Sequence, residues 1–432
     1  MAITSDSAAV RELSGRLKRP DRGENGYREG RETRTRVETL KRLRDLAEEG
    51  KVTREGKAGG INTHVHTSKS FAYFDSPSDA VWQAYLAKLS VFGINDHYTL
   101  AGHDEFGKAC KALGIRATFS LEAVATWEAA AKAKQTVNDP ANPGRTYLTA
   151  KGVTRPFAPG CSGEADLQRM NEALLVRNQK ITEKLAKLIA TRLKKKEAIS
   201  WAEVLDLTPH GQPTERHICQ AAARWLEQTY PELEKRSLAL SKLVGEDVPV
   251  GTVDDAATFQ DFIRAKLVKT GKPAYVEESK DAFVPIERLV RLGLDLGAIP
   301  TYPILGNPIS PWEEDLDKLF DRLEALGIHA VEVIPNRNTQ ERLSAIVKTA
   351  AARCYPIFNG TEHNTKSAMP LVDKFFFEDE FRPHFERGAR VLLGHQALRA
   401  GGKDGYIRED GTLLPGGREE GLKRSEDAGR RR

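Results

Sequence analysis

Three short apolar runs in the first third of the chain each end in side chains that bind metal ions. INTHVHT contains His64 and His66, VFGINDH ends in Asp96 and His97, and FSLEA contains Glu122. The connection after each of the first two runs is long enough for one helix leading to a parallel strand. Because the carboxyl ends of parallel strands meet at one face of a barrel, we expect these side chains to share one site.

The pair His64 and His66 suits joint metal binding. Residues i and i+2 of a strand point to the same face, so both imidazoles face one side while Val65 faces the other. Imidazole and carboxylate together favour Zn²⁺, Mn²⁺ or Fe²⁺ over Ca²⁺ or Mg²⁺. We expect one or two such divalent ions, with Glu122 able to bridge two. They would lower the pKa of a water molecule and hold a phosphoryl oxygen.

Strands and helices alternate on both sides of a long helical stretch, which predicts an α/β fold. The candidate strands cover about residues 61–67, 91–96, 115–123, 145–153, 297–308, 329–336 and 355–365. Each of them ends in polar or ionisable residues, as expected for strands that converge on the C-terminal face of a barrel. A later apolar run, ARVLLGHQAL, fits either an eighth strand or a flanking element.

The barrel is expected at about residues 57–400, with a helical insertion at about 160–280 that could instead serve as a pair of oligomerisation helices. Residues 1–56 are interpreted as a basic, partly helical extension, and residues 401–432 as a flexible charged tail. The arginines of the helix over residues 32–49 are interpreted as the solvated face of a packing helix rather than as a nucleic-acid binding surface.

Net charge, apolar runs and cysteine spacing limit the classes of protein to which this chain can belong. The net charge of +5 is only a weak indication of an anionic partner, so we expect a small anionic substrate rather than nucleic acid. The sequence contains no apolar run of about 18 residues, the length that a membrane span needs. The four cysteines form no CxxC pair, which argues against a zinc knuckle and a disulfide framework. We expect a cytoplasmic protein of undetermined oligomeric state.

THVHT, INDH and the LE of FSLEA resemble, in order and spacing, the first three motifs of the PHP (polymerase and histidinol phosphatase) superfamily. The resemblance covers about residues 57–366. It implies a distorted (β/α)7 TIM-like barrel that holds two or three metal ions at the C-terminal ends of its strands and hydrolyses phosphoesters. The metal ligands that it implies are His64, His66, His97 and the bridging Glu122.

Two further segments resemble elements of that family. GTEHN resembles the last metal motif and implies Glu362 and His363 as ligands, although the usual Asp-x-His order is changed. Within the insertion, Arg216 and His217 resemble an Arg-x-His element without its spacer, so that Arg216 would grip phosphate and His217 would act as general acid. Both residues could instead simply begin the helix that follows. Asp96 would orient a metal ligand or act as one.

The sequence departs from the family pattern at several positions. Ser70 and Phe71 stand where relatives have an aspartate, and Tyr147 or a neighbour replaces a histidine of the fourth strand. The Ala-His-Pro that the family has after its fifth strand is replaced here by Thr301-Tyr302-Pro303. Tyr302 is therefore a candidate for substrate contact or proton donation. These losses predict one firmly bound ion and at most a second. Further candidates for gripping or contacting substrate are Lys69, His103, Asn307 and Arg337.

These observations predict a metal-dependent hydrolase, with a phosphoesterase favoured. One alternative keeps the barrel and the metal but performs amide hydrolysis, or a lyase or isomerase step on a sugar-like compound. Another treats the site as degenerate and the chain as a nucleic-acid or protein binding module. The absence of a GxxxxGK[ST] loop, a GxSxG elbow and a dinucleotide fingerprint disfavours an NTPase, a serine hydrolase and a nicotinamide enzyme.

Overall fold

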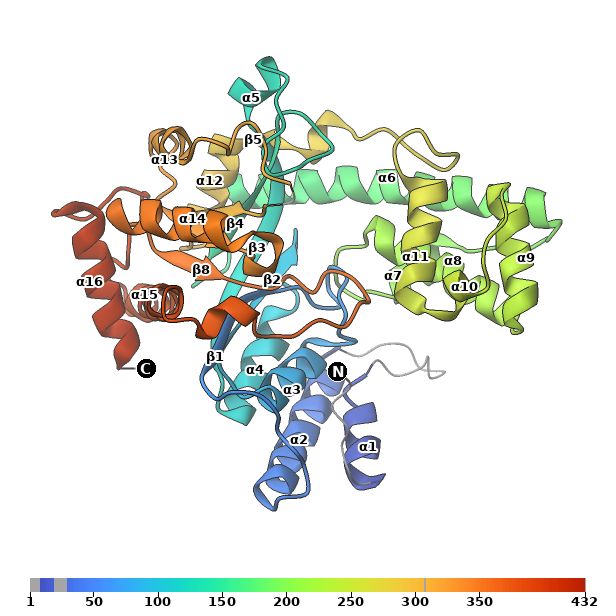
Figure 1. Ribbon diagram of the computed structural model, residues 1–432, viewed down its shortest axis with the longest axis horizontal. Coiled ribbons are helices and arrows are strands. Elements are labelled where there is room, and N and C mark those ends of the chain that lie inside the picture. The colour runs from blue at the N-terminus through green and yellow to red at the C-terminus, as the bar shows by residue number, and fades with distance from the viewer. Residues whose placement is uncertain (1–7, 19–28, 307, 432) are drawn as a thin grey trace.

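The computed structural model describes residues 8–18, 29–306 and 308–431 (Figure 1). Its centre is a sheet whose strands follow the path β1-β2-β3-β4-β6-β7-β8, with the short strand β5 pairing beside β3. This architecture confirms the expected TIM-like α/β barrel. The strands are β1 Gly60–Val65, β2 Leu89–His97, β3 Arg116–Thr126, β4 Arg145–Lys151, β5 Val284–Pro285, β6 Ile299–Ile304, β7 Ala330–Val333 and β8 Ile357–Asn359.

The first and last strands approach each other and nearly close the barrel. The segment after β8 forms a parallel bridge to β1, at Val65 and Glu362. The backbone N–H of His66 donates to the carbonyl of Glu362 at 2.8 Å, and the N–H of Glu362 donates to the carbonyl of His64 at 3.0 Å. These bonds lock the residues around the GTEHN segment beside the two histidines of β1.

Strand β4 departs from the parallel pattern. It pairs antiparallel with both β3 and β6, because the chain between β3 and β4 contains only the short helix α5 Glu128–Lys132 and turns straight back. The expectation that every strand ends at one face of the barrel is therefore wrong for β4. Its final residue, Lys151, lies fully buried inside the barrel instead.

Helices cover the outside of the barrel. They are α3 Pro77–Leu86, α4 His103–Leu113, α12 Ile286–Asp295, α13 Leu316–Ala325, α14 Gln340–Ala352 and α15 Arg382–Ala400, with short 3-10 segments at Lys280–Ala282, Pro335–Arg337 and Lys374–Phe377. Local sequence sets their ends. The Ser76 side chain accepts from the N–H of Asp79 at the start of α3, with Pro77 next in the chain. Gly114 ends α4 with a φ of 68°, in the left-handed region that glycine adopts without strain.

Two N-terminal helices, α1 Ala8–Gly15 and α2 Glu29–Glu48, lie against this helical layer. The apolar side chains of Leu40 and Leu43 on α2 are fully buried. Arg36 is 4% exposed and forms an ion pair of 2.6 Å with Glu105 of α4. The buried leucines confirm that this helix packs on the rest of the chain, but Arg36 departs from the expected solvated face because it lies within the packed interface.

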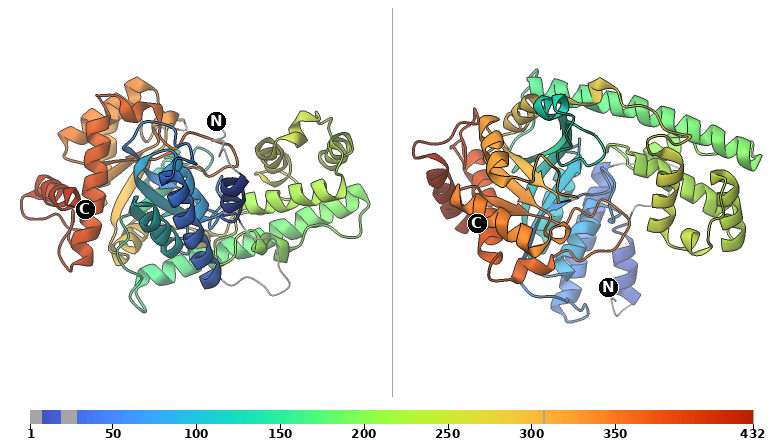
Figure 2. Two further views of the ribbon diagram at one scale, coloured as in Figure 1. Left: turned by 90° about the horizontal axis from the view of Figure 1, so that it is seen from below. Right: turned by 45° about the horizontal axis from the view of Figure 1, so that its top comes forward.

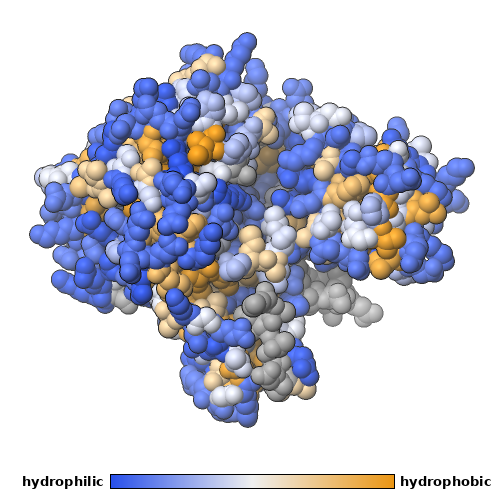
Figure 3. Space-filling view, in the orientation of Figure 1, coloured by the Kyte–Doolittle hydropathy of each residue, from blue (hydrophilic) through white to orange (hydrophobic). Residues whose placement is uncertain are grey.

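The insertion forms a separate lobe beside the barrel (Figures 1 and 2). It comprises α6 Ser162–Leu193, α7 Trp201–Asp206, α8 Glu215–Thr229, α9 Leu233–Val244, α10 Gly251–Asp254, α11 Ala256–Ile263 and a π-helical segment Arg264–Val268. The lobe has its own apolar core, which includes Ile181, Leu226 and Phe259. Figure 3 shows a mainly hydrophilic face with some hydrophobic side chains gathered on this lobe. None of the helices in the described ranges is long and apolar enough to cross a membrane.

The C-terminal part differs from expectation. Instead of a flexible tail, residues 401–432 contain the helix α16 Gly417–Arg430, which packs on α15 on the side of the barrel away from the lobe (Figure 2). The run ARVLLGHQAL is not an eighth strand but the middle of α15, a flanking element of the barrel. It is buried between β8 and α16, so its apolar residues show no clear helical stripe. Gly394 permits the close approach, since a Cβ there would lie 1.7 Å from the carbonyl oxygen of Ser425.

Candidate metal centre

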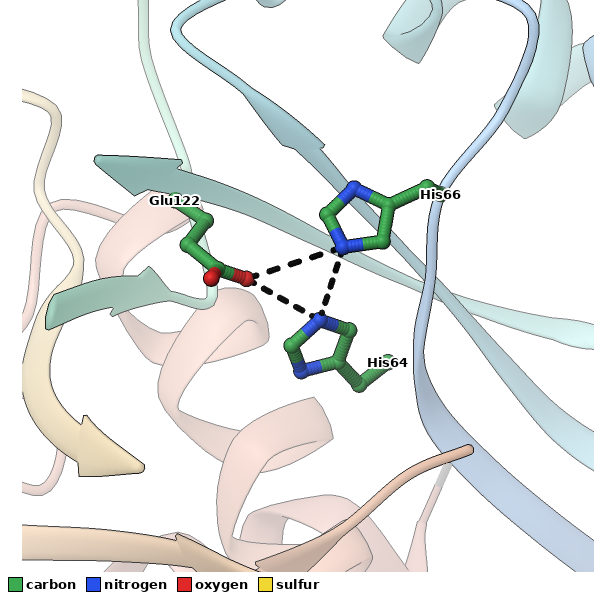
Figure 4. Close-up of side chains that lie close together, drawn as sticks. All are labelled: His64, His66 and Glu122. Carbon is green, nitrogen blue, oxygen red and sulfur yellow. Dashed lines mark hydrogen bonds and ion pairs between the residues drawn. The ribbon is translucent and has the colours of Figure 1, made fainter. Parts of the chain in front are cut away.

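Three of the predicted ligands converge inside the barrel. The Nε2 atoms of His64 and His66 lie 3.3 Å apart. The Oε2 atom of Glu122 is 3.0 Å from the first and 3.7 Å from the second (Figure 4). All three residues are buried, and within the described part of the chain they form the one group whose ligand atoms lie close enough to hold a metal ion.

The strand geometry explains the convergence. β1, β2 and β3 are parallel neighbours, and His97 of β2 pairs in register with Glu122 of β3. The His97 ring lies 4.2 Å from the His66 ring, centroid to centroid, and its Nδ1 is 3.9 Å from Glu122 Oε1. His97 therefore borders the cluster on the other oxygen of Glu122, at the position from which it could complete or extend a metal site.

Hydrogen bonds fix which nitrogen of each histidine can bind metal. Ser70 Oγ donates its only proton to Asp96 Oδ1 at 2.6 Å, so at its 3.3 Å contact with His66 Nδ1 it must accept. Asn95 Nδ2, which can only donate, lies 2.8 Å from His64 Nε2, so Nε2 is the accepting nitrogen of that ring. Both rings thus carry their proton on Nδ1 and direct the lone pair of Nε2 into the cluster.

The electrostatics agree with this assignment. Burial, reinforced by neighbouring positive charge, lowers the pKa of His64 and of His66 well below the usual 6.5, so both stay neutral at pH 7. Burial and then the nearby charge of Glu362 raise the pKa of Glu122 well above its usual value. The two Nε2 lone pairs point toward each other and toward the Glu122 carboxylate, an arrangement that can bind a cation. The residues present therefore fit a divalent ion of the Zn²⁺, Mn²⁺ or Fe²⁺ type.

Asp96 does not join the cluster. Its carboxylate accepts from the backbone N–H and the hydroxyl of Thr67, both at 2.6 Å, and from Ser70. It therefore holds the turn after β1 and reaches His66 through the Ser70 hydroxyl. This placement is compatible with the predicted role in orienting a ligand, which stays a prediction.

The structure separates the two ligands predicted from GTEHN. The buried carboxylate of Glu362 receives Arg337 Nη1 at 2.6 Å and Nη2 at 2.8 Å, and Asn364 Nδ2 at 2.6 Å. His363 points elsewhere, with Nδ1 2.7 Å from Thr361 Oγ1 and Nε2 3.1 Å from the carbonyl of Met369. Glu362 and His363 have φ values of 65° and 56°, a strain for residues with a Cβ that recurs at functional sites.

Arg216 and His217 begin helix α8, and both contact Phe71 of the loop after β1. The His217 ring meets the Phe71 ring edge-on at 5.0 Å, and its Nδ1 accepts from the N–H of Thr214. The Arg216 guanidinium lies 5.8 Å from the Phe71 ring and pairs with Asp261 at 2.7 Å. After burial, the charge of Arg216 is the next cause that lowers the pKa of His97, to about 4. The charge of Arg216 therefore acts on His97, which borders the metal cluster.

A cavity of 220 Å³ lies between the barrel and the lobe next to these residues. The loop after β1 is tied to the lobe beside it, since the backbone N–H of Gln212 donates to the carbonyl of Lys69 at 2.6 Å. Gly211 allows this approach, because a Cβ there would lie 2.3 Å from the same carbonyl. The residues lining the cavity include Ser68, Phe71, Asp75, His217, Gln220 and Arg224.

The remaining candidates lie outside the cluster. Lys69 is buried and donates to the carbonyl of Pro209 at 2.9 Å. Tyr302 donates to Glu313 at 3.0 Å in the core behind the sheet, and His103 Nε2 contacts the carbonyl of Ser120 at 3.0 Å. The Tyr147 ring lies 6.2 Å from the His97 ring, at the edge of the site. Asn307 falls outside the described residues.

Two residues that contact the cluster were not predicted from the sequence. Asn95 Nδ2 lies 2.8 Å from both His64 Nε2 and Glu122 Oε2. A signal for it existed, because Asn95 stands two residues before His97 and so shares its face of β2. Glu332 is the other, and its only signal was an acidic residue within the apolar run HAVEVIPN.

No protein-family model matches the chain, and no curated protein matches it. Among solved structures, the chain is similar to a provisionally assigned metal-dependent phosphoesterase from Bifidobacterium adolescentis, with a TM-score of 0.49 and 19% identity over 77% of this chain and 98% of that one. It is also similar to an amidohydrolase from Chromobacterium violaceum with bound sulfate and no metal, with a TM-score of 0.46 and 15% identity over 75% and 97% of the two chains. Neither similarity is close enough to establish an activity or a site residue.

Proposed function

We propose that this protein is a metal-dependent hydrolase and that its substrates are phosphoesters of small anionic compounds. The observation that carries the proposal is the pair of histidine nitrogens, Nε2 of His64 and of His66, that face Glu122 with their lone pairs inward. Such a donor set can bind a divalent cation. The order HxH, DH and E on successive strands, which resembles the PHP superfamily, supports the same reading.

The buried charges also favour a bound cation. Three buried carboxylates, Glu122, Glu332 and Glu362, meet two cations, Lys151 and Arg337. Lys151 pairs with Glu332 and Arg337 pairs with Glu362, while Glu122 lies against the two neutral histidines. A divalent ion at the cluster would stabilise the ionised form of Glu122 and supply the Lewis acidity that makes water a nucleophile near pH 7.

The surrounding residues have separate tasks in this proposal. Arg337 and Asn364 hold the Glu362 carboxylate in one orientation beside β1. Arg216, fixed by Asp261, offers its remaining N–H groups to a phosphate oxygen, for which the planar guanidinium is well suited. His217 lies deeper against Phe71 and can donate a proton to a leaving group only through its Nε2, because Nδ1 is held by Thr214.

The activity is tested with a panel of phosphomonoesters, matched by amides and esters that lack phosphate. We expect inorganic phosphate to be released when the protein is supplied with Mn²⁺, Zn²⁺ or Fe²⁺. Chelation should stop the release, and the same ion should restore it. Turnover of an unphosphorylated compound without any phosphate release would instead favour amide hydrolysis or a lyase or isomerase step. Salt-sensitive nucleic-acid binding without stoichiometric metal would favour the binding-module alternative.

Replacing Arg216 with methionine tests the phosphate contact. We expect KM for a phosphorylated substrate to rise about ten- to a hundredfold, because a charge-assisted hydrogen bond contributes about 1.5–3 kcal/mol. Metal content should be unchanged. The matched control is Lys242→Met, which removes an exposed positive charge from α9 of the same lobe. Equal effects of the two variants on KM would show that only the net charge of the lobe matters.

A further inference from the structure

A lysine and a glutamate form an ion pair in the middle of the barrel. Lys151 of β4 and Glu332 of β7 are both 0% exposed, and Lys151 Nζ lies 2.5 Å from Glu332 Oε1. Lys151 reaches this position because β4 runs antiparallel and ends inside the barrel. Neither residue was a candidate from the sequence.

The pair also holds two consecutive residues of β1. Lys151 Nζ donates to the carbonyl of Thr63 at 3.0 Å. The second oxygen of Glu332 lies 3.0 Å from His64 Nδ1. One buried unit therefore joins three strands that lie far apart in the sequence, and it contacts the metal cluster on the side opposite Glu122.

Stability alone does not account for this arrangement. Removing two charges from water is costly, and replacing a buried ion pair with apolar residues of similar volume is often neutral or stabilising. What the pair supplies that apolar residues cannot is a carboxylate oxygen 3.0 Å from His64 Nδ1, within ion-pair distance. Partners of this kind fix the tautomer and the ring orientation of metal-binding histidines.

We propose that Lys151 and Glu332 act together as positioning residues for the metal centre. Glu332 holds His64 with its Nε2 lone pair directed at Glu122 and His66, and Lys151 holds Glu332 in place and balances its charge. This inference rests on the proposed metal site, but it concerns metal affinity rather than the reaction that the metal serves.

The test replaces both residues, in Lys151→Met/Glu332→Met, so that no unpaired charge is left buried. Affinity for Zn²⁺ and for Mn²⁺ is measured by calorimetry on the full chain, and thermal unfolding is measured without metal. We expect metal binding to weaken about 10- to 100-fold, the usual loss when a partner of a metal ligand is removed. Unchanged affinity would overturn the proposal, since the pair would then be only structural.

The matched control is Arg36→Met/Glu105→Met, which removes another deeply buried ion pair, between α2 and α4. Its metal affinity should equal that of the native chain. If the first double variant fails to fold, Glu332→Gln serves instead. Its amide keeps the volume but presents one oxygen and no negative charge to Lys151 and His64, so weaker metal binding is again expected. Native affinity would again overturn the proposal.

The outcome is separable from that of the proposed function. If the native chain binds metal but releases no phosphate from any ester, the proposed activity fails while the affinity comparison still decides the role of the pair. If the native chain hydrolyses phosphoesters and the double variant binds metal normally, the positioning role fails and the activity stands. At saturating metal, the double variant should regain much of its turnover, because its defect lies in holding the ion.

Discussion

The double variant His64→Ala/Glu122→Ala is expected to lose both bound metal and hydrolytic activity. These residues supply two of the three ligand atoms that converge in the barrel, and His66 alone cannot hold an ion. Because a metal ion contributes several kcal/mol to stabilising the transition state, turnover should fall about a thousandfold or more. Metal content is measured by elemental analysis of protein purified without chelator, and activity with the best ester of the panel.

The fold of this variant should persist. The substitutions remove a buried carboxylate whose pKa is raised by burial and by the charge of Glu362, so the metal-free variant should be no less stable than the metal-free native chain. His384→Ala, at the start of α15, is the control and should keep native metal content and turnover. Retention of stoichiometric metal and full activity by the double variant would falsify the assignment of this cluster as the metal centre.

Replacing Arg36 with methionine is expected to have the largest effect on stability. The substitution leaves Glu105 buried without its partner, and breaking a buried pair in this way costs about 3–5 kcal/mol. Glu105 would keep only the bonds from the N–H of Ser78 and the hydroxyl of Thr33. Urea unfolding monitored by circular dichroism measures the loss, and Arg36→Met/Glu105→Met should recover most of it.

The same pair should respond to acid. Burial alone would raise the pKa of Glu105, but the hydrogen bond and charge of Arg36 outweigh it and hold that pKa below the usual 4.5. A carboxyl group with a lowered pKa adds stability above its unfolded-state pKa and loses it as the pH falls through the folded-state value. The difference in unfolding free energy between native protein and the Arg36→Met variant should therefore shrink below about pH 4.5. A difference independent of pH would exclude the ion pair as its source.

The strand ends were predictable because their signals are local. Apolar runs, turn residues and crossover lengths indicated the seven strands of the barrel path, and the two-residue period placed His64 and His66 on one face. The same reasoning failed for segments whose secondary structure depends on tertiary packing. The run within α15 is apolar on several sides because β8 and α16 cover it, so its period did not reveal a helix. The charged composition of residues 401–432 likewise concealed a helix whose glycines allow close packing.

The sequence by itself determined which residues could bind a metal, because ligand type and strand alternation are properties of short segments. Only the tertiary structure decided how those ligands are held. Glu332, Lys151 and Arg337 come from strands and loops distant in the chain, and no local pattern relates them to His64 or Glu362. The reversal of β4 illustrates the reason: it follows from a short connection, yet it places a lysine inside the barrel, where its charge can act on the metal site.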